Sequence, residues 1–526
     1  MGFKKKFVNL VSVLLIGLLL NHCAVYREVA VPQDQSFSYE GRALKLIWED
    51  SDIQDMYMVE TSMVDNKLIG LVISGRFYTP PAKSQKVDIY IDPSIVPPDS
   101  LPTQFSFPVS AIKKIELFEL DVEESVGITV LNTGFAVVMV FAVIFAIILL
   151  TKESCPFIYV HDGESYQFTG EIYSGAIYPH LERDDFLPLP QLKHPEDEYH
   201  LKMTNEVREI QYTNLTELLV IDHPDDTDVL VDKYGTCYTL KDLQTPKTAI
   251  SSNRQNILPQ IVKRDSQKYL GDSFEDPDPT MDSIVLSFDN TQKMDSAKLV
   301  VRAKNSFWLD YVFAQFFELF GDNYDKWLEK QKNLKEGKQK NWSLEQGIPL
   351  SVYLEKNGDW QFIDYYNVVG PIIEKDIVLS LDISDIDSEE IKIKLEFGFL
   401  FWEIDFVGMD FSPQQPVEQN VVSLTSAVDH NGLDVTELLV QSDDNYFIMP
   451  AIGDQVILKF AVPKKVMNDQ NRSIFLHSRG HYEVIRNPEG RADVSYLRSF
   501  RHPGKFSQFS KEIYLELERK IKNQVW

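Results

Sequence analysis

Residues 126–150 read VGITVLNTGFAVVMVFAVIFAIILL, and none of these side chains is ionisable. As a helix with a rise of about 1.5 Å per residue, the stretch would reach roughly 37 Å, enough to cross a hydrocarbon core of about 30 Å. A helix buried in a soluble domain normally keeps a polar face, and here only Thr129, Asn132 and Thr133 interrupt the apolar surface. The stretch therefore predicts a transmembrane helix, with a wholly buried helix as the alternative.

The chain begins with the features of an export signal. Residues 1–23 read MGFKKKFVNLVSVLLIGLLLNHC, in which three lysines precede an apolar run and a cysteine. The end of this stretch resembles the signal of bacterial lipoproteins, although Asn21 and His22 replace the small residues that normally precede the cysteine. The resemblance implies a signal peptide over residues 1–22 and lipidation of Cys23, with an uncleaved signal anchor as the alternative.

The composition limits the classes of function. A chain of 526 residues predicts three or four domains, and its 32 Phe and 23 Tyr favour aromatic-rich sheets. The net charge of −27 repels nucleic-acid phosphates and anionic lipid headgroups. We therefore expect no nucleic acid among the partners.

Short strands separated by turns precede the apolar stretch. They read ALKLIW, KLIGLVISGRFY, KVDIYI and FSFPVSAIKKIELFEL, a spacing that predicts a small barrel over residues 23–125. The block FSFPVSAIKKIEL resembles small SH3-like or Sm-like barrels of envelope lipoproteins. That resemblance implies a β-barrel fold for this part of the chain.

A β-rich domain is expected over residues 152–275. The pair Asp162–Gly163 stands between two alternating aromatic runs and predicts a hairpin. The segments SCPFIY, GEIYSGAI and LERDDFLPL, with the later FWEIDFVGMDFS and SIFLHSRGHYE, resemble a family of uncharacterised envelope lipoproteins or membrane proteins of Bacteroidota-like bacteria. The resemblance implies a cell-envelope protein and brings no known activity with it.

A second β-unit is expected over residues 276–415. From Ile391 to Phe397 apolar and charged residues alternate, which predicts a half-exposed antiparallel strand. The strand order resembles galactose-binding-like jelly rolls with a helical insertion over residues 307–342, and residues 416–526 add a C-terminal β-unit and helix. The predicted fold class is mainly β: a small barrel, one transmembrane-type helix, then two or three antiparallel β-units.

Most catalytic sequence motifs are missing, and we expect no cofactor. One candidate metal site remains, because His194, Glu196, Glu198 and His200 alternate. On a strand these four side chains would share one face and could bind zinc or another divalent ion. Pro195 favours a solvated loop instead.

A second group of candidates is the charged segment around residue 182. Glu182, Asp184 and Asp185, beside His180 and Arg183, could hold calcium or an acid–base pair. A solvated turn or an internal pairing of arginine with carboxylates is the alternative.

Two further expectations concern single side chains. Trp402, Glu403 and Asp405 could form the rim of a ligand site, with packing of the tryptophan in the core as the alternative. Cys155 and Cys237 could form a disulfide if their compartment is oxidising.

Together these patterns predict a membrane-anchored binding or scaffold protein of the bacterial cell envelope. Its soluble domains are expected in the periplasm, although flanking charges leave a cytoplasmic placement of residues 152–526 open. The expected partners are the membrane, other envelope proteins and carbohydrate. The alternative function is a carboxylate-dependent hydrolase acting on envelope glycans.

Overall fold

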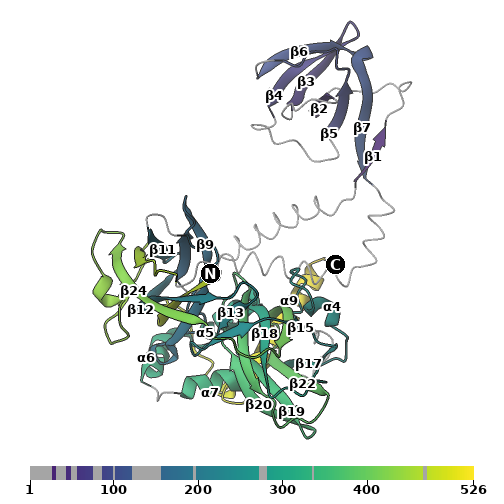
Figure 1. Ribbon diagram of the computed structural model, residues 1–526. Helices are drawn as coiled ribbons and strands as arrows, with labels where there is room; N and C mark the ends of the chain where they lie inside the picture. The colour runs from purple at the N-terminus through teal and green to yellow at the C-terminus, as the bar shows by residue number, and fades with distance from the viewer. Residues whose placement is uncertain are drawn as a thin grey trace. The chain divides into compact units, whose positions relative to one another are not determined.

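The computed structural model describes residues 26–30, 43–48, 56–74, 86–98, 101–120, 156–193, 197–271, 281–333, 337–465 and 471–525. The chain divides into two compact units, Met1–Val143 and Ile144–Trp526 (Figure 1). The expected signal peptide and the expected transmembrane helix at 126–150 both lie outside the described residues. Within the described ranges, no helix combines the length and the apolar character that a membrane crossing requires. The described chain is mainly β, as the sequence predicts.

The first unit is a seven-stranded sheet that curls strongly and approaches a barrel (Figure 1). Asp65 and Asn66 take positive φ angles of 48° and 60° between β3 and β4, as a tight hairpin turn requires. The pairing of β2 with β5 is parallel, whereas the other pairs are antiparallel. The sheet order is β1-β7-β5-β2-β3-β4-β6. The strands are β1 (Tyr26–Ala30), β2 (Ala43–Trp48), β3 (Met56–Val64), β4 (Lys67–Ser74), β5 (Lys86–Ile91), β6 (Thr103–Pro108) and β7 (Ile112–Leu120); the 3₁₀ helix η2 is Val109–Ala111.

In the second unit, nine strands from the beginning and the end of its sequence form one hydrogen-bonded sheet. β24 links two layers, because its first half pairs with β12 and its second half pairs with β26. Leucines from both layers, such as Leu201, Leu218, Leu458 and Leu476, are fully buried in one core. The members are β8 (Phe157–His161), β9 (Tyr166–Glu171), β10 (Arg183–Pro188), β11 (Glu198–Thr204), β12 (Glu209–His223), β24 (Glu418–Asp429), β25 (Phe447–Met449), β26 (Gln455–Ala461) and β27 (Asn471–Val484), with the 3₁₀ helices η3 (Pro179–Leu181) and η6 (Thr436–Leu438).

This pairing corrects one expected domain boundary. The sequence predicts a separate C-terminal β-unit over residues 416–526. Instead β24, β26 and β27 complete the sheets that β8 to β12 begin. The physical reason is that β12 has no neighbour from its own half of the chain, so strands from the C-terminal part supply its backbone hydrogen bonds.

A second pair of sheets forms a sandwich-like body. In β22 the predicted alternation is confirmed, because Ile391, Ile393, Leu395 and Phe397 are fully buried between partly exposed neighbours. The four-stranded sheet has the order β15-β23-β18-β21 and the five-stranded sheet the order β16-β17-β22-β19-β20. The strands are β15 (Leu243–Gln244), β16 (Thr248–Ser251), β17 (Met281–Asp289), β18 (Ser296–Asn305), β19 (Leu350–Lys356), β20 (Asp359–Tyr366), β21 (Lys375–Asp382), β22 (Glu390–Gly398) and β23 (Trp402–Asp410).

A short hairpin, β13 (Asp228–Val231) and β14 (Cys237–Leu240), packs against both bodies. Val229 and Cys237 contact the apolar cluster of β12 and β27, whereas Leu240 on the other face contacts β18 and β21. Because alternate side chains point in opposite directions, one hairpin can hold the nine-stranded part and the sandwich-like body together.

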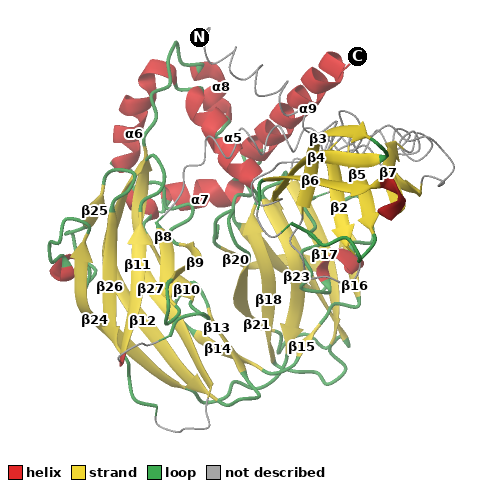
Figure 2. Cartoon of the chain, turned by 90° about the horizontal axis from the view of Figure 1, so that it is seen from above, coloured by secondary structure: helices red, strands yellow, loops and turns green. Residues whose placement is uncertain are grey.

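The helices α5 to α9 gather at one end of the strands of the second unit (Figure 2), whereas the short α4 packs against β23 and β16. Three of them lie between β18 and β19, and the Ser306 side chain caps the first by accepting a hydrogen bond from Leu309 N. The long α9 is fixed by Ser507 and Ser510, whose hydroxyls bond the backbone of Phe399. The helices are α4 (Leu258–Ile261), α5 (Phe307–Glu318), α6 (Tyr324–Lys332), α7 (Lys338–Glu345), α8 (Val494–Ser499) and α9 (Lys505–Val525), with the 3₁₀ helix η5 (Gly321–Asn323).

Candidate functional site

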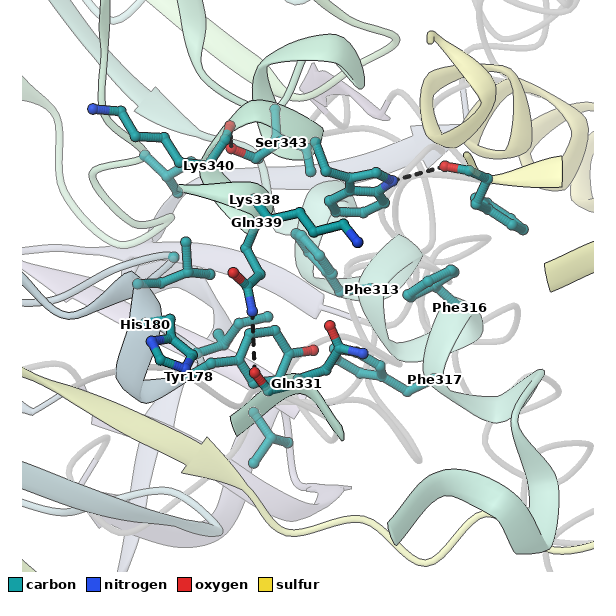
Figure 3. Close-up of a pocket in the computed structure, with 18 of the residues that line it drawn as sticks. Tyr178, His180, Phe313, Phe316, Phe317, Gln331, Lys338, Gln339, Lys340 and Ser343 are labelled. Carbon is teal, nitrogen blue, oxygen red and sulfur yellow. Dashed lines mark hydrogen bonds between the residues drawn. The ribbon is translucent and has the colours of Figure 1, made fainter. Parts of the chain in front are cut away.

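A cavity of about 1340 Å³ lies beneath these helices (Figure 3). Its walls come from α5, α6, α7 and α8, and its floor comes from η3, the start of β10 and the end of β27. Segments that are far apart in sequence therefore meet around one space. The volume exceeds the range of about 300–1,000 Å³ that is usual for small-molecule sites.

A network of five charges, which we call the floor network, supports the cavity floor: Glu182, Asp184 and Arg479 line the cavity, and His477 and Glu217 extend the network without lining it. Strand pairing creates it, because Asp184 lies opposite Arg479 and Glu217 lies opposite His477. Asp184 accepts from Arg479 Nη1 at 2.9 Å and from His477 Nε2 at 3.0 Å. The other ring nitrogen of His477 donates to Glu217 at 2.8 Å. Both ring nitrogens thus donate, which requires the imidazolium form.

The residues of the floor network have pKa values that are shifted in different directions. Burial alone would lower the pKa of His477, but the hydrogen bonds and charges of Asp184 and Glu217 outweigh burial and raise this pKa to about 9. Burial raises the pKa of Asp184, yet His477 and Arg479 more than offset it, so that this pKa is lowered. Burial raises the pKa of Glu182, against the opposing charge of Arg479.

Glu182 has internal partners for both of its oxygens. Asn214 Nδ2 donates to one at 3.0 Å and the Tyr446 hydroxyl donates to the other at 3.2 Å. Tyr446 also lies edge-on to His481, which stacks on Tyr212 with ring centroids 4.6 Å apart. Burial, together with the charge of nearby Lys332, lowers the pKa of His481 to about 4. His477 and His481, both on β27, therefore differ in charge at neutral pH: His477 is protonated and His481 is neutral.

The segment that the sequence singles out around residue 182 lines the cavity, but with internal bonds. His180 Nε2 lies 2.8 Å from the backbone oxygen of Lys332. Arg183 donates to the backbone oxygens of Ser174 and Val368 and so bridges the nine-stranded part and the sandwich-like body. Asp185 accepts from the backbone of Tyr173 at 3.1 Å. Arg183 thus bonds backbone oxygens, whereas the carboxylates Glu182 and Asp184 pair with Arg479 of β27.

The cavity mouth carries exposed positive charges that the sequence analysis did not identify. Six side chains, which we call the mouth cations, are exposed and have no carboxylate within 4 Å in the part of the chain that the structure describes. They are Lys326, Lys330, Lys338, Lys340, Arg498 and Arg501. The lysine-rich run of residues 326–340 was the signal available in the sequence, and nothing local connected it with the two arginines of α8 and its end.

Aromatic side chains lie among the mouth cations. Trp342 is fixed by its Nε1, which donates to the backbone oxygen of Phe500 at 2.7 Å. Gln339 Nε2 donates to the backbone oxygen of Gln331 at 3.2 Å and joins α7 to α6 (Figure 3). Phe313 is half-buried on the opposite wall, and Lys338 extends toward its side of the cavity (Figure 3). The mouth therefore combines cations with apolar surface on fixed helices.

The candidate metal site is only partly described. Glu198 and His200 lie on β11, where His200 Nε2 is 3.2 Å from Glu198 and Lys459 pairs with the same carboxylate at 3.3 Å. His194 and Glu196 lie outside the described residues. Across the described ranges, no group of three or more His, Cys, Asp or Glu side chains is arranged to hold a metal ion.

The three residues that could form the rim of a ligand site lie in the interior of the protein instead. Trp402 is fully buried and donates to the backbone oxygen of Ile348 at 3.0 Å. Glu403 pairs with Lys268 at 3.3 Å, and Asp405 is buried and accepts from the backbone of Ser266. The alternative stated for this group, core packing of the tryptophan, describes its position.

Cys237 lies on β14, where burial raises the pKa of its thiol to about 11. It is the one cysteine within the described ranges, and its thiol is free there. Cys23 and Cys155 lie outside those ranges, so lipidation and the disulfide stay predictions.

Comparison with known proteins adds no assignment to this geometry. No model of a known protein family matches the chain, and no characterised protein matches it significantly in sequence.

Proposed function

We propose that this chain is a membrane-anchored binding or scaffold protein of the bacterial cell envelope, with its soluble parts in the periplasm and its ligand in the cavity beneath α5 to α8. The proposal includes an SH3-like or Sm-like barrel for the first unit and a jelly-roll-like arrangement for β17 to β23. The observation that carries the binding function is the cavity itself, which is walled by helices from two distant parts of the chain.

The arrangement of the floor network favours binding over catalysis. A general acid or base must have an oxygen within reach of the substrate. Both oxygens of Glu182 and both oxygens of Asp184 already accept hydrogen bonds from neighbouring side chains. These carboxylates therefore hold the floor of the cavity in shape.

Blocking the cavity tests this function. In the variant Ser343→Trp a large ring on α7 enters the space, whereas Asn341→Trp on the same helix places the ring on a residue that does not line the cavity. Full-length protein is titrated by calorimetry with envelope glycans and with phospholipids. We expect binding of at least one compound that Ser343→Trp removes and Asn341→Trp retains. Binding that survives in both variants contradicts the proposal.

A hydrolase acting on envelope glycans is the second candidate. The raised pKa of Glu182 beside the lowered pKa of Asp184 favours it, because such a split is typical of an acid paired with a carboxylate base or nucleophile. Turnover of glycan, ester or peptide substrates that is lost in Glu182→Gln would replace the binding function with this one.

The periplasmic placement has its own test. Leu433 is 61% exposed on a loop of the second unit, so that Leu433→Cys offers a reactive thiol. A maleimide that cannot cross the inner membrane should label this cysteine in cells whose outer membrane alone is opened. Protection until the inner membrane is broken would place the second unit in the cytoplasm.

A further inference from the structure

We infer that the ligand of this cavity is an amphipathic anion: a phosphate ester headgroup on apolar chains, as in an anionic phospholipid. The inference rests on the proposed binding function and names its ligand class. Its starting point is a contrast between global and local charge. The whole chain carries a net charge of −27, which disfavours anions, yet the mouth of this cavity presents six exposed cations.

The head of the ligand is recognised by the mouth cations. Lysine and arginine side chains with no carboxylate partner among the described residues are available to donate to phosphate oxygens. A local positive region in an acidic protein also restricts where an anion binds, because the rest of the surface repels it.

The apolar part of the ligand is accommodated by the walls. Phe313, Trp327 and Trp342 are half-buried there, and Val494 of α8 remains 50% exposed at the edge. Exposed apolar surface beside a cavity is costly in water, and burial against hydrocarbon chains stabilises a complex by about 25 cal/mol per Å².

The distribution of donors and acceptors argues against a sugar as the ligand. Sugar hydroxyls donate, and their usual acceptors are carboxylates and amide oxygens. The two floor carboxylates, Glu182 and Asp184, already accept bonds from Asn214, Tyr446, His477 and Arg479. Asp310 also lines the cavity, but among its described lining residues ten lysines and arginines outnumber these three carboxylates, which suits a ligand rich in acceptors such as a phosphate ester.

Three probes distinguish recognition of the anionic headgroup from binding of the apolar chains: dihexanoyl phosphatidylglycerol, dihexanoyl phosphatidylcholine and glycerol 3-phosphate. Full-length protein is held in a neutral amphipathic polymer, so that no micelle competes for the lipid. We expect the phosphatidylglycerol to bind at least about tenfold more tightly than either other probe, since charge-assisted bonds and apolar burial are both needed. Its affinity should also fall with added salt.

Charge variants locate the head. Lys338→Gln combined with Arg498→Gln removes two mouth cations, and we expect about a tenfold loss of phosphatidylglycerol affinity. The matched control is Lys293→Gln with Lys464→Gln, two exposed lysines outside the cavity, which should change affinity less than about twofold because charges on exposed surfaces contribute little. The blocking variant Ser343→Trp should abolish binding.

The other outcomes are also decisive. Equal binding of phosphatidylcholine, or equal loss in both double variants, overturns the anionic head. Equal binding of glycerol 3-phosphate overturns the apolar part. If glycans bind in a Ser343-dependent manner and no lipid does, the ligand class is wrong while the binding function stands. If nothing in either panel binds, both fail.

Discussion

The floor and the mouth of the cavity contain charged side chains in opposite circumstances. In the floor network every carboxylate and cation has a partner of opposite charge, as with Asp184 between His477 and Arg479. The mouth cations have no carboxylate nearby in the described chain, as with Lys338 and Arg498. Paired, half-buried charges maintain a shape, whereas exposed, unpaired charges are available to a ligand. The comparison therefore predicts that floor variants change stability and that mouth variants change binding.

The largest effect on stability is expected for Asp184→Asn. The amide keeps the shape of the side chain but leaves His477 and Arg479 facing each other without the intervening charge. Hydrogen bonds to charged groups contribute about 1.5–3 kcal/mol each, and because Asp184 is only half-buried we expect a loss of about 3 kcal/mol for the two. Urea unfolding followed by circular dichroism measures the loss. Asp387→Asn at an exposed site is the control, and a loss of similar size there would contradict the special role of the floor.

His477→Gln is expected to change the pH dependence of stability. The folded pKa of about 9 lies above the ordinary value of 6.5, so this histidine stabilises the fold fully below pH 6.5 and the contribution is lost as pH rises to 9. The difference corresponds to about 3 kcal/mol. Wild-type protein should therefore lose stability between pH 6.5 and 9, and the variant should show a flatter profile. Parallel profiles would show that the imidazolium is not the cause.

His481→Phe should change the pH dependence of stability below pH 7. The folded pKa of about 4 lies below 6.5, so that acid favours the unfolded chain, and stability falls as pH drops from 6.5 toward 4. At pH 5 the cost is about 2 kcal/mol. Phenylalanine keeps the stack on Tyr212 and cannot take up a proton. Thermal unfolding at pH 5 and pH 7 should show a smaller difference for the variant than for the wild type.

The smallest effect on stability is expected at the mouth. Lys338→Gln with Arg498→Gln should change the free energy of unfolding by less than about 0.5 kcal/mol, because these exposed charges form no ion pair with any residue that the structure describes. The same urea titration measures it. A loss of 2 kcal/mol or more would show that the mouth cations are structural, and the contrast with the floor would disappear.

Local patterns in the sequence predicted the elements better than their pairing. The alternation at Ile391 to Phe397 identified β22, and the Asp162–Gly163 turn identified the hairpin of β8 and β9, where the Asp162 side chain accepts from the backbone of Glu164. Both signals depend on neighbours in the chain. The pairing of β12 with β27 has no such signal, since it joins positions about 250 residues apart.

The candidate site also depends on pairing between distant parts of the chain, which local sequence patterns do not predict. The charged segment at residues 180–185 was recognisable, because several charged side chains stand together in the sequence. Its partners His477 and Arg479 come from the other end of the chain, and only strand register brings them together. For Trp402 the sequence leaves core packing and a ligand rim open, and the side chain is fully buried because β23 lies inside the second unit.

The late pairing of β12 also has a consequence for biosynthesis. Ser473 bonds His223 across 250 positions, and a ribosome that adds about 5–20 residues per second needs roughly 12–50 s to make that length of chain. During this interval β12, a 15-residue strand, has none of its three partner strands and exposes its backbone along both edges. An unpaired strand of that length readily joins another copy. We therefore expect β12 to be prone to aggregation during synthesis, until its last partner strands are made.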